Sequence, residues 1–571
     1  MEGFISAFAG ADPSYLNVYI SIMRYLMPIL VLLLLIRCGK PLLSFRREPE
    51  SWAWLCLADG NKIPVTHWEN VIGRSKGSDI CIDFSTVSRI HAVLTRYDDG
   101  SWTLTDAGSK AGVRINGEAV NMCVLHPGDK IEIGGVPMTL QPISAKQEKR
   151  LAQLRTKGSG VFRSIGDVAL LTVVQLLMAV GFLLSGTDGR SVILGFSGIL
   201  VAQWLLLLLY IGIRRTAFEV ETIAFFLCTM GMAAICAVKP GEAFKQLIAL
   251  YGGIGLFLGV GGSLRKHSRA QKCRYIAAVA GVAFLVITLV FGKEYYGAKN
   301  WLVIGSLSLQ PSELSKVCFV YAGTAAMHRL ISKGNLLRFI AYSIAICGCL
   351  ALMNDFGTAL IFFCAFLIIA FLRSGSVGTI ALACTSLGFA GVLALKIAPH
   401  AMRRFAAWRH VWEYPLTSGY QQTRALMCIS AGGLFGLGAG QGWMKNLFAA
   451  DSDVVFATLS EEWGLLTVLM MVACILVLGL FVLRSAAVSR SSLYTISACA
   501  AAGILLTQCI LNGLGTVDVV PLTGVTFPFV SNGGSSMLGS WGLLAFIKAV
   551  DTRQNASFAV PLAPKRRDTD E

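Results

Sequence analysis

The chain has 571 residues, of which 55% are hydrophobic and only 14% are charged. Soluble globular chains carry about 25% charged residues, so this composition excludes an ordinary soluble enzyme and indicates a large membrane body with a smaller polar part. The formal net charge is +16, but Lys and Arg lie mainly in short loops between apolar runs. No basic stripe with interleaved aromatic residues is present, so nucleic acid is not an expected partner.

The N-terminal part of the chain contains an apolar run followed by a polar region. The run at residues 17–37 is long enough to span a bilayer and predicts a membrane anchor within residues 1–45. Residues 50–143 contain no run of that length. Their short alternating runs are bounded by turn residues, as at Asn116-Gly117, which is typical of a hairpin. This pattern predicts an all-β sandwich.

The rest of the chain is almost continuously apolar. Residues 144–217 are expected to form a linker and two extra spans, residues 218–550 a core of ten spans, and residues 551–571 a polar tail. With the first anchor this gives about 13 spans. The predicted fold is therefore a polytopic α-helical membrane protein with an inserted all-β sandwich. The spans after the sandwich are predicted near residues 167–186, 190–213, 218–238, 243–262, 274–292, 312–332, 337–353, 355–373, 377–397, 454–483, 492–514 and 531–550.

The distribution of positive charge predicts how the chain is oriented in the membrane. Short loops that stay in the cytoplasm are enriched in Lys and Arg. The sandwich and the C-terminus fall on the basic side of the predicted spans, so we expect both to be cytoplasmic. Two larger loops, residues 293–311 and 398–453, are expected outside. The basic clusters that share one side lie near residues 214–215, 265–274, 329–338, 373, 484–490 and 565–567.

Three short motifs in the polar region indicate a site for a phosphorylated peptide. An Arg and a Ser hydroxyl can form charge-assisted hydrogen bonds with a phosphate group. The order and spacing of the motifs resemble those of the forkhead-associated (FHA) domain, a family that binds phosphothreonine peptides from loops at one end of a sandwich. The motifs are Val71-Ile72-Gly73-Arg74-Ser75, Val87-Ser88-Arg89-Ile90-His91-Ala92 and Ser109-Lys110-Ala111-Gly112-Val113-Arg114-Ile115-Asn116-Gly117.

The FHA resemblance gives roles to individual residues. It implies that Arg74 and Ser88, with Arg89 beside them, bind the phosphate of a phosphothreonine protein, and that His91 braces the loops. The family's usual Asn, which grips the peptide backbone, is Ala111 here. A second interpretation is therefore a sandwich kept for protein contacts without phosphate recognition.

Five polar or glycine-rich clusters interrupt the second half of the chain. The glycine run at residues 432–442 lacks the strand–turn–helix context of a dinucleotide site and is interpreted as close packing. In their order, the clusters resemble the SEDS family (shape, elongation, division and sporulation), which includes RodA, FtsW and SpoVE. The resemblance covers about residues 218–550. The clusters lie at residues 309–316, 354–359, 419–442, 451–464 and 521–536.

The SEDS resemblance implies a function in the wall of a bacterial cell. The family consists of peptidoglycan glycosyltransferases of the cell membrane, which polymerise lipid II into glycan strands during elongation, division or sporulation. The expected partner is a transpeptidase, a class B penicillin-binding protein. Two alternatives stay open: a lipid II flippase, whose polar residues would line a transport path, and a scaffold without catalytic activity.

Glycan polymerisation determines the chemistry expected of the site. A sugar hydroxyl is a poor nucleophile and needs a carboxylate base, and a diphosphate leaving group needs cationic stabilisation. By resemblance, Asp453 is the catalytic residue and Arg404 contacts the diphosphate. A helix N-cap is the structural alternative for Asp453. The other candidates for substrate binding are Glu313, Lys316, Lys445 and Ser535.

Two positions depart from the SEDS pattern close to Asp453. Asp451 stands where the family commonly has His, and Asn532 stands where it usually has Tyr. The loop therefore carries two neighbouring carboxylates. One of them could have a raised pKa, or Asp451 and Asp453 could together hold a divalent cation, Mg²⁺ or Mn²⁺. No organic cofactor is expected.

Overall fold

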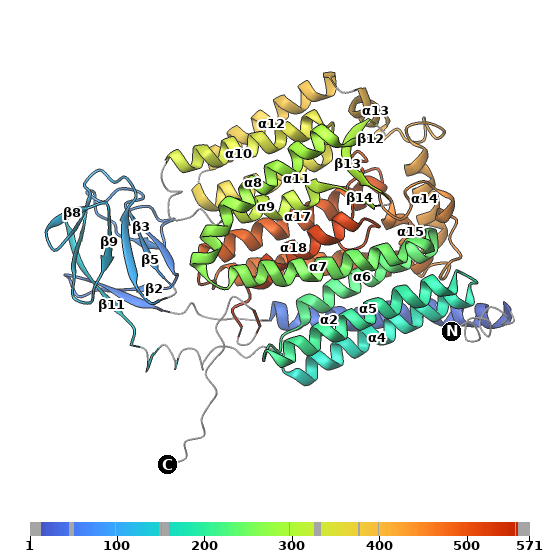
Figure 1. Cartoon of the computed structure of the whole chain (residues 1–571), viewed down its shortest axis with the longest axis horizontal. Helices are drawn as coiled ribbons and strands as arrows, with labels where there is room; N and C mark the ends of the chain where they lie inside the picture. The colour runs from blue at the N-terminus through green and yellow to red at the C-terminus, as the bar shows by residue number, and fades with distance from the viewer. Residues whose placement is uncertain are drawn as a thin grey trace, which may run out of the picture.

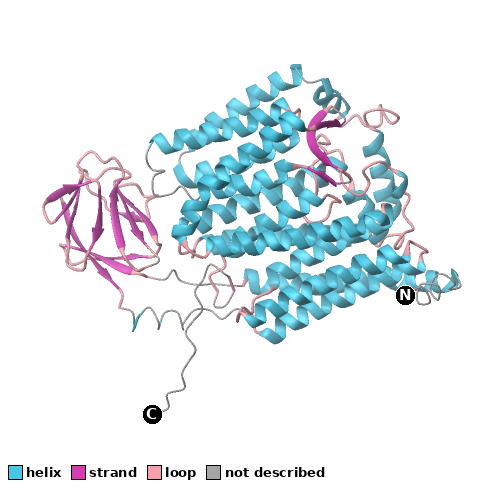
Figure 2. Ribbon diagram, viewed as in Figure 1, coloured by secondary structure: helices cyan, strands magenta, loops and turns pink. Residues whose placement is uncertain are grey.

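The computed structural model consists of a β-sandwich and a body of long helices that run side by side (Figures 1 and 2). It describes residues 13–557 except 45–50, 98, 145, 148–149, 151–158, 296, 306, 325–332, 375–376, 398 and 554–555. The sandwich lies beyond one end of the helices, here called the sandwich end. A small sheet and short loop helices lie at the other, here called the opposite end (Figure 1).

The sandwich contains a six-stranded sheet, with the order β2-β1-β11-β10-β7-β8, and a five-stranded sheet, with the order β4-β3-β5-β6-β9. Side chains that point between the sheets, such as Leu94, Leu104 and Ile133, are buried. Asn116 and Gly117 have φ of 54° and 90° between β7 and β8, which confirms the predicted hairpin turn. The strands are β1 (Ala53–Leu57), β2 (Lys62–Val65), β3 (Glu69–Gly73), β4 (Ile80–Cys81), β5 (Ala92–Arg96), β6 (Trp102–Asp106), β7 (Val113–Ile115), β8 (Glu118–Val120), β9 (Met122–Leu125), β10 (Lys130–Ile133) and β11 (Val136–Pro142).

The helical body confirms the polytopic α-helical fold. Within the described residues, eight helices are long and apolar enough to cross a membrane, and α10 and α11 contain shorter apolar segments. The long helices are α2 (Pro13–Leu43), α4 (Val161–Leu184), α5 (Gly189–Gly212), α6 (Glu219–Val238), α7 (Ala243–Leu264), α8 (His267–Phe291), α9 (Pro311–Thr324), α10 (Lys333–Leu352), α11 (Phe356–Ser374), α12 (Val377–Ile397), α16 (Leu465–Ala486), α17 (Ser492–Thr516) and α18 (Gly534–Ala549). The predicted basic cluster at residues 565–567 lies outside the described residues.

One predicted span is divided in two. The sequence predicts a continuous span over residues 454–483, but the structure has a short helix, α15 (Val455–Trp463), followed by α16. The break is at Gly464, which has φ of 83°, and a Cβ there would lie 2.4 Å from the carbonyl oxygen of Leu434. Only glycine fits this position without strain. The break leaves the residues before α15 in a loop at the opposite end.

The glycine run at residues 432–442 packs against α15. The N–H groups of Leu437 and Gly438 donate to the carbonyl oxygens of Glu461 and Glu462 at 2.8 and 3.0 Å. A Cβ at Gly432 would lie 2.4 Å from the carbonyl oxygen of Ser460. The glycines therefore allow two backbone segments to come into contact, as the sequence predicts.

The N-terminal helices α2, α4 and α5 pack onto α6, and α2 and α5 also contact α16 and α7 of the core. α6 is enclosed over almost its whole length. Between these helices the Gln175 and Gln203 side chains bond to each other at 2.9 Å, and Gln175 also donates to the Thr229 hydroxyl at 3.0 Å. These amides are buried and mutually satisfied. They fix the register of the added helices against α6.

The sandwich is docked on the N-terminal end of α17. Glu69, the first residue of β3, accepts hydrogen bonds from the Ser491 hydroxyl at 2.9 Å and from the N–H of Ser492 at 3.0 Å. Ser491 is the N-cap of α17, so the Glu69 carboxylate lies at a helix N-terminus, where negative charge is favourable. The Arg490 guanidinium lies 5.3 Å from the centre of the Trp52 ring. Because Glu69 and Ser491 are buried, the two parts share an interface.

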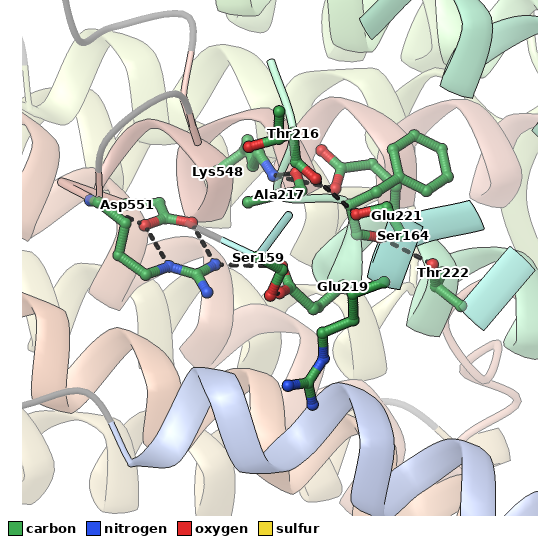
Figure 3. Close-up of polar contacts among 12 residues, drawn as sticks. Ser159, Ser164, Thr216, Ala217, Glu219, Glu221, Thr222, Lys548 and Asp551 are labelled. Atoms are coloured by element: carbon green, nitrogen blue, oxygen red, sulfur yellow. Dashed lines mark hydrogen bonds and ion pairs between the residues drawn. The ribbon is translucent and has the colours of Figure 1, made fainter. Parts of the chain in front are cut away.

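Buried charges join α6 to α18 at the sandwich end (Figure 3). The Lys548 ammonium lies 3.0 Å from the Glu221 carboxylate and donates to the carbonyl oxygen of Ala217 at 2.8 Å. Glu221 also accepts a hydrogen bond from the Tyr210 hydroxyl at 2.8 Å. The two charged side chains are 1% and 0% exposed. Each charge therefore has further polar partners, as a buried ion pair requires.

A second buried group lies beside this pair and involves the residues after α18. The Arg553 guanidinium donates to both Asp551 oxygens at 2.7 and 2.9 Å and lies 3.3 Å from the Glu219 carboxylate. Ser159, just before α4, donates a hydrogen bond to Glu219 (Figure 3). The segment that leads from the sandwich to α4 is thereby tied to the start of α6 and the end of α18.

Candidate active site

A cavity of about 910 Å³ lies at the opposite end of the helical body. Part of its wall is a three-stranded sheet of β12 (Lys293–Tyr295), β13 (Ala298–Ile304) and β14 (Leu307–Leu309). Other parts come from the start of α11, from the loop helices α13 (Pro399–Ala407) and α14 (Tyr420–Gly432), and from the loops at residues 448–453 and 521–526. The two long loops that the sequence predicts on one side of the membrane therefore meet around one cavity.

Asp453 lines this cavity from the loop before α15. Its N–H donates to the carbonyl oxygen of Ala449 at 3.0 Å, and its own carbonyl oxygen accepts from the Asn512 amide at 3.0 Å. Among the described residues, no group donates a hydrogen bond to its carboxylate. The N-cap of α15 is Val454, and it makes no side-chain capping bond. Asp453 is therefore not the helix cap, and its carboxylate is open to a ligand.

The surroundings of Asp453 change its proton affinity. Burial raises the pKa of Asp453 above its ordinary value, the Arg404 guanidinium opposes this shift, and Asp451 adds to it. A carboxylate with a raised pKa is a stronger base than a free one, and the guanidinium keeps the ionised form accessible. This combination suits a group that accepts a proton from a hydroxyl.

Arg404 lines the same cavity from α13. Its guanidinium donates to the carbonyl oxygen of Leu522 at 3.2 Å. Trp408, just beyond α13, donates its indole N–H to the carbonyl oxygen of Val519 at 3.1 Å. Both acceptors lie in the segment that follows α17. These two hydrogen bonds therefore fix the position of Arg404 relative to the segment that follows the C-terminal end of α17.

Gly524 lies between the two charged groups. A Cβ at this position would be 3.5 Å from Oδ2 of Asp453 and 3.9 Å from a guanidinium nitrogen of Arg404. Gly524 also has φ of 70°, a conformation that favours glycine. The space shared by the carboxylate and the guanidinium is open because residue 524 carries no side chain.

Gly524→Ala is expected to lower any reaction that uses both charged groups by about tenfold to a hundredfold, because the added methyl group enters the space between them. It also introduces left-handed backbone strain of about 1–2 kcal/mol. Gly186→Ala is the matched control, since Gly186 has φ of 76° and nothing lies within 4 Å of its Cβ position. Melting temperature and turnover measured on both variants separate the effects. Equal turnover in the two variants would show that the open space between Asp453 and Arg404 is not used in the reaction.

Asp451 is directed away from the cavity, although it is only two residues from Asp453. Its carboxylate lies 3.1 Å from the Lys239 ammonium and accepts from the Asn532 amide at 2.7 Å. The N–H of Asn532 donates to the carbonyl oxygen of Asp451 at 2.8 Å. The two departures from the SEDS pattern thus contact each other, and together they fasten the loop that carries Asp453.

This geometry does not fit a cation held jointly by Asp451 and Asp453. Asp451 is 1% exposed, and both of its carboxylate oxygens already have partners. In the described part of the chain, no three His, Cys, Asp or Glu side chains are grouped so that they could hold a metal ion. No step of the reaction is therefore derived through a metal. A requirement for Mg²⁺ or Mn²⁺ stays a prediction, tested by adding and chelating the ion in the assay.

The other predicted substrate residues lie at the edge of the cavity or outside it. Glu313 lines the cavity but forms an ion pair at 2.7 Å with Lys316, as their spacing on α9 predicts. Lys316 is fully buried and does not reach the cavity. Ser535 accepts a hydrogen bond from the N–H of Gln310 at 2.7 Å. Lys445 is exposed and donates to a carbonyl oxygen of the glycine run at 3.2 Å. Lys316, Ser535 and Lys445 therefore do not line the cavity.

Two amide side chains that were not predicted as site residues also line the cavity. Asn300 on β13 and Gln310 donate to Oδ2 of Asp355 at 3.2 and 3.4 Å, while Oδ1 of Asp355 accepts from the N–H of Thr358 at 3.1 Å. Asp355 thus joins the small sheet to the start of α11. Asn300 and Gln310 both belong to the predicted outer loop at residues 293–311. Amide side chains in that loop are the sequence feature that could have pointed to them as cavity residues.

The predicted phosphopeptide residues lie at the end of the sandwich remote from the docked interface. β3 begins at Glu69, which is docked on α17, and ends next to Arg74. Arg74 and Arg89 are exposed, and the Ser88 hydroxyl accepts a hydrogen bond from the N–H of Lys110 at 3.1 Å. Docking therefore leaves these loops accessible.

His91 braces the same loops, as the resemblance implies. It is fully buried, and its Nδ1 accepts the N–H of Ser88 at 3.0 Å. Nε2 must then carry the proton, which it donates to the carbonyl oxygen of Gly112 at 2.9 Å. His91 thus fixes two of the three motif loops relative to each other.

Fold and site together define a class: a multi-pass membrane protein with a cavity lined by a carboxylate and a guanidinium at one end and an attached β-sandwich at the other. A family model described as cell cycle protein, for FtsW, RodA and SpoVE, matches residues 241–556. A second model, described as FHA domain, matches residues 70–134. Since the first match covers more than half of the chain, the protein belongs to the FtsW, RodA and SpoVE family and carries an FHA domain.

Two sequence relatives agree with this assignment. The peptidoglycan glycosyltransferase RodA of Mycobacterium tuberculosis is 27% identical over 331 residues, which cover 54% of this chain and 70% of its own. The probable peptidoglycan glycosyltransferase FtsW of Bacillus subtilis is 32% identical over 348 residues, 56% of this chain and 85% of its own. The crystal structure of RodA from Thermus thermophilus has a TM-score of 0.43 at 22% identity and covers 58% of this chain and 94% of its own. The enzyme class of the family is that of the peptidoglycan glycosyltransferases.

Proposed function

We propose that this chain polymerises lipid II into glycan strands on the outer side of a bacterial cell membrane. The observation that carries the proposal is the open carboxylate of Asp453, which lies with the Arg404 guanidinium beside Gly524 in one cavity. A base and an anion-binding group at one place are what transfer from a diphosphate to a hydroxyl requires.

In the proposed reaction, the Asp453 carboxylate accepts the proton of a sugar hydroxyl while the hydroxyl oxygen attacks the anomeric carbon of a second lipid-linked sugar. The bond from that carbon to the diphosphate oxygen breaks, and the lipid diphosphate leaves with the electron pair. The Arg404 guanidinium offsets the charge that develops on the leaving oxygen. General base catalysis of this kind contributes about 10²–10⁴-fold to a rate.

We infer that the sandwich end faces the cytoplasm and that the cavity faces outward. Arg214 and Arg215 follow α5 and Arg265 follows α7, and both helices end at the sandwich end (Figure 1). Arg484 lies in the last turn of α16, and Arg490 follows that helix and contacts the sandwich. Such an excess of positive charge is typical of cytoplasmic loops. Lipid II would then enter the cavity with its sugars already on the outer side, where glycan strands are built.

Two protein partners follow from the family and the domain content. The transferase is proposed to work with a class B penicillin-binding protein, whose transpeptidase activity cross-links the strands. The FHA domain is proposed to bind a phosphothreonine protein in the cytoplasm. Arg74 and Ser88 support this second proposal because they lie on accessible loops braced by His91.

The test of the proposed function is glycan polymerisation by the purified full-length protein on lipid II, with and without the cognate transpeptidase and a divalent cation. Chains made by the wild type, and lost in Asp453→Asn, are the expected result. If no chains form with the correct transpeptidase present, the proposal fails. Translocation of lipid II in liposomes would then decide between a flippase and an inert scaffold.

Arg74→Ala is expected to weaken binding of phosphothreonine peptides to the full-length protein by at least about tenfold, because a charge-assisted hydrogen bond contributes about 1.5–3 kcal/mol. Lys62→Ala is the control, since Lys62 is also a cation exposed on the sandwich but lies on β2, outside the three motifs. Binding is measured by fluorescence anisotropy with phosphorylated and unphosphorylated peptides of one sequence. If both variants bind like the wild type, the sandwich serves protein contacts without phosphate recognition.

A further inference from the structure

Asn512, near the end of α17, donates hydrogen bonds to two separate walls of the cavity. Its amide nitrogen lies 3.0 Å from the carbonyl oxygen of Asp453 and 2.9 Å from the carbonyl oxygen of Val525, with the carbonyl oxygen of Ser452 more distant at 3.4 Å. An Asn amide has two N–H groups, so both are used. Because its hydrogen-bond partners among the described residues are all carbonyl oxygens, the orientation of the amide is fixed by its neighbours.

The two walls that Asn512 joins are those that carry the charged groups of the site. Asp453 belongs to the loop before α15, and Val525 belongs to the segment at residues 521–526. The same segment contains Leu522, whose carbonyl oxygen accepts from Arg404. The backbone behind the carboxylate is thus tied to the backbone that holds the guanidinium. Asn512 is 1% exposed and does not line the cavity, so it has no contact with a ligand there.

We propose that Asn512, near the C-terminal end of α17, is a positioning residue that sets the distance between Asp453 and Arg404. The inference rests on the proposed function, because that separation matters only if both groups act on one substrate. No other side chain among the described residues is hydrogen-bonded to both the Asp453 backbone and the segment at residues 521–526.

Loss of Asn512 is expected to loosen the site without unfolding the protein. The loop that carries Asp453 keeps other anchors: Ser531 donates to the carbonyl oxygen of Ser452 at 2.7 Å, and Thr458 donates to the carbonyl oxygen of Ala450 at 2.7 Å. What is lost is the donor for two buried carbonyl oxygens, and these would then seek water or new partners. A shift of about 1 Å at a reacting group is enough to cost about a hundredfold in rate.

Two substitutions remove the donor in different ways. Asn512→Asp keeps the shape but faces the carbonyl oxygens with acceptors only, and Asn512→Leu keeps the size with an apolar side chain that a membrane helix tolerates. Gln508→Leu is the matched control. Gln508 lies one turn earlier on α17, is equally buried, and its amide nitrogen has no hydrogen-bond partner among the described residues.

The experiment measures two properties of the full-length protein. Steady-state polymerisation of lipid II with the cognate transpeptidase should show kcat lowered about a hundredfold in both Asn512 variants, with KM within about threefold of the wild type. Hydrogen exchange, followed by mass spectrometry, should rise in peptides covering residues 449–454 and 521–532 in these variants. Gln508→Leu should match the wild type in both measurements.

The outcomes separate this inference from the proposed function. Unchanged exchange in both segments overturns the role of Asn512, whatever the activity. Raised exchange with an unchanged kcat also overturns it, because the hydrogen bonds of Asn512 to the two walls then have no effect on the reaction. If the wild type forms no glycan chains, the proposed function fails and the positioning role fails with it, while a rise in exchange still establishes Asn512 as the link between the two walls.

Discussion

Asp453→Asn is expected to lower the rate of lipid II polymerisation by about 10²–10⁴-fold, because the amide cannot accept the proton of the attacking hydroxyl. The structure makes this a sharp test, since the Asp453 carboxylate accepts no hydrogen bond from the described residues and its loss leaves no buried donor without a partner. Folding should therefore be preserved. The rate is measured on purified protein with the cognate transpeptidase, and the melting temperature of the same sample is recorded.

Asp451→Asn is the control for this substitution. Asp451 carries the same charge in the same loop, but it faces Lys239 and Asn532 rather than the cavity. The Lys239 side chain is 51% exposed and can be solvated when its partner becomes neutral. This variant should keep at least about a tenth of the wild-type rate, because solvent screens the lysine end of the ion pair and an amide oxygen can still accept from Asn532. A larger loss in Asp451→Asn than in Asp453→Asn would reverse the roles assigned to the two carboxylates.

The pH dependence provides a further check on the first prediction. A general base must be ionised, so activity is lost as the pH falls through its pKa. Because burial raises the pKa of Asp453, the acid limb of the pH–rate profile should lie above the value of about 4 that is usual for a free carboxyl group. A limb at the ordinary value would contradict the assignment of Asp453 as a buried base.

Lys548→Met is expected to destabilise the protein by about 3–5 kcal/mol, because it leaves the Glu221 carboxylate buried without its cation. Glu221 is fully enclosed beside Lys548 (Figure 3), and among the described side chains it keeps a hydrogen bond from the Tyr210 hydroxyl at 2.8 Å. The pair joins α6 to α18, so its loss acts on the core of the membrane body. Thermal unfolding in detergent, followed by near-UV circular dichroism, measures the change.

Two further variants show whether the buried charge causes this effect. Lys245→Met removes a lysine from an ion pair with Glu242 whose side chains are 50% and 37% exposed, and it should change stability by less than about 1 kcal/mol. Combining Lys548→Met with Glu221→Gln removes both charges and should recover part of the loss. If the double variant is less stable than Lys548→Met alone, desolvation of the unpaired Glu221 is not the cause.

Local features of the fold and site could be predicted from the sequence. The Asn116-Gly117 turn, the strands that flank it and the ion pair of Glu313 with Lys316 all depend on neighbours in the chain. The family resemblance pointed to Asp453 and Arg404 through the short motifs that contain them, and both line the cavity. The long apolar runs predicted the membrane helices for the same reason, since length and composition alone determine whether a segment can span a bilayer.

Contacts between distant segments could not be predicted in this way. The spacing of Lys239 and Asp451 in the sequence carries no information on their ion pair, which depends on how α6 lies against the loop before α15. The link from Asn512 to Asp453 depends in the same way on the packing of α17. The break at Gly464 was missed because an apolar sequence continues through it, and the cause is a backbone contact with Leu434 from another segment. Such contacts are properties of the tertiary structure alone.

The docking of the sandwich on α17 also has a consequence for biosynthesis. The sandwich is complete once β11 has been made, whereas its binding surface on the body, at Arg490 and Ser491, is translated much later. Domains generally fold in the order in which they leave the ribosome. Trp52 and Glu69 therefore stay uncovered while α4 to α16 enter the membrane. Closure of this interface marks the moment at which the membrane body has been inserted nearly to its end.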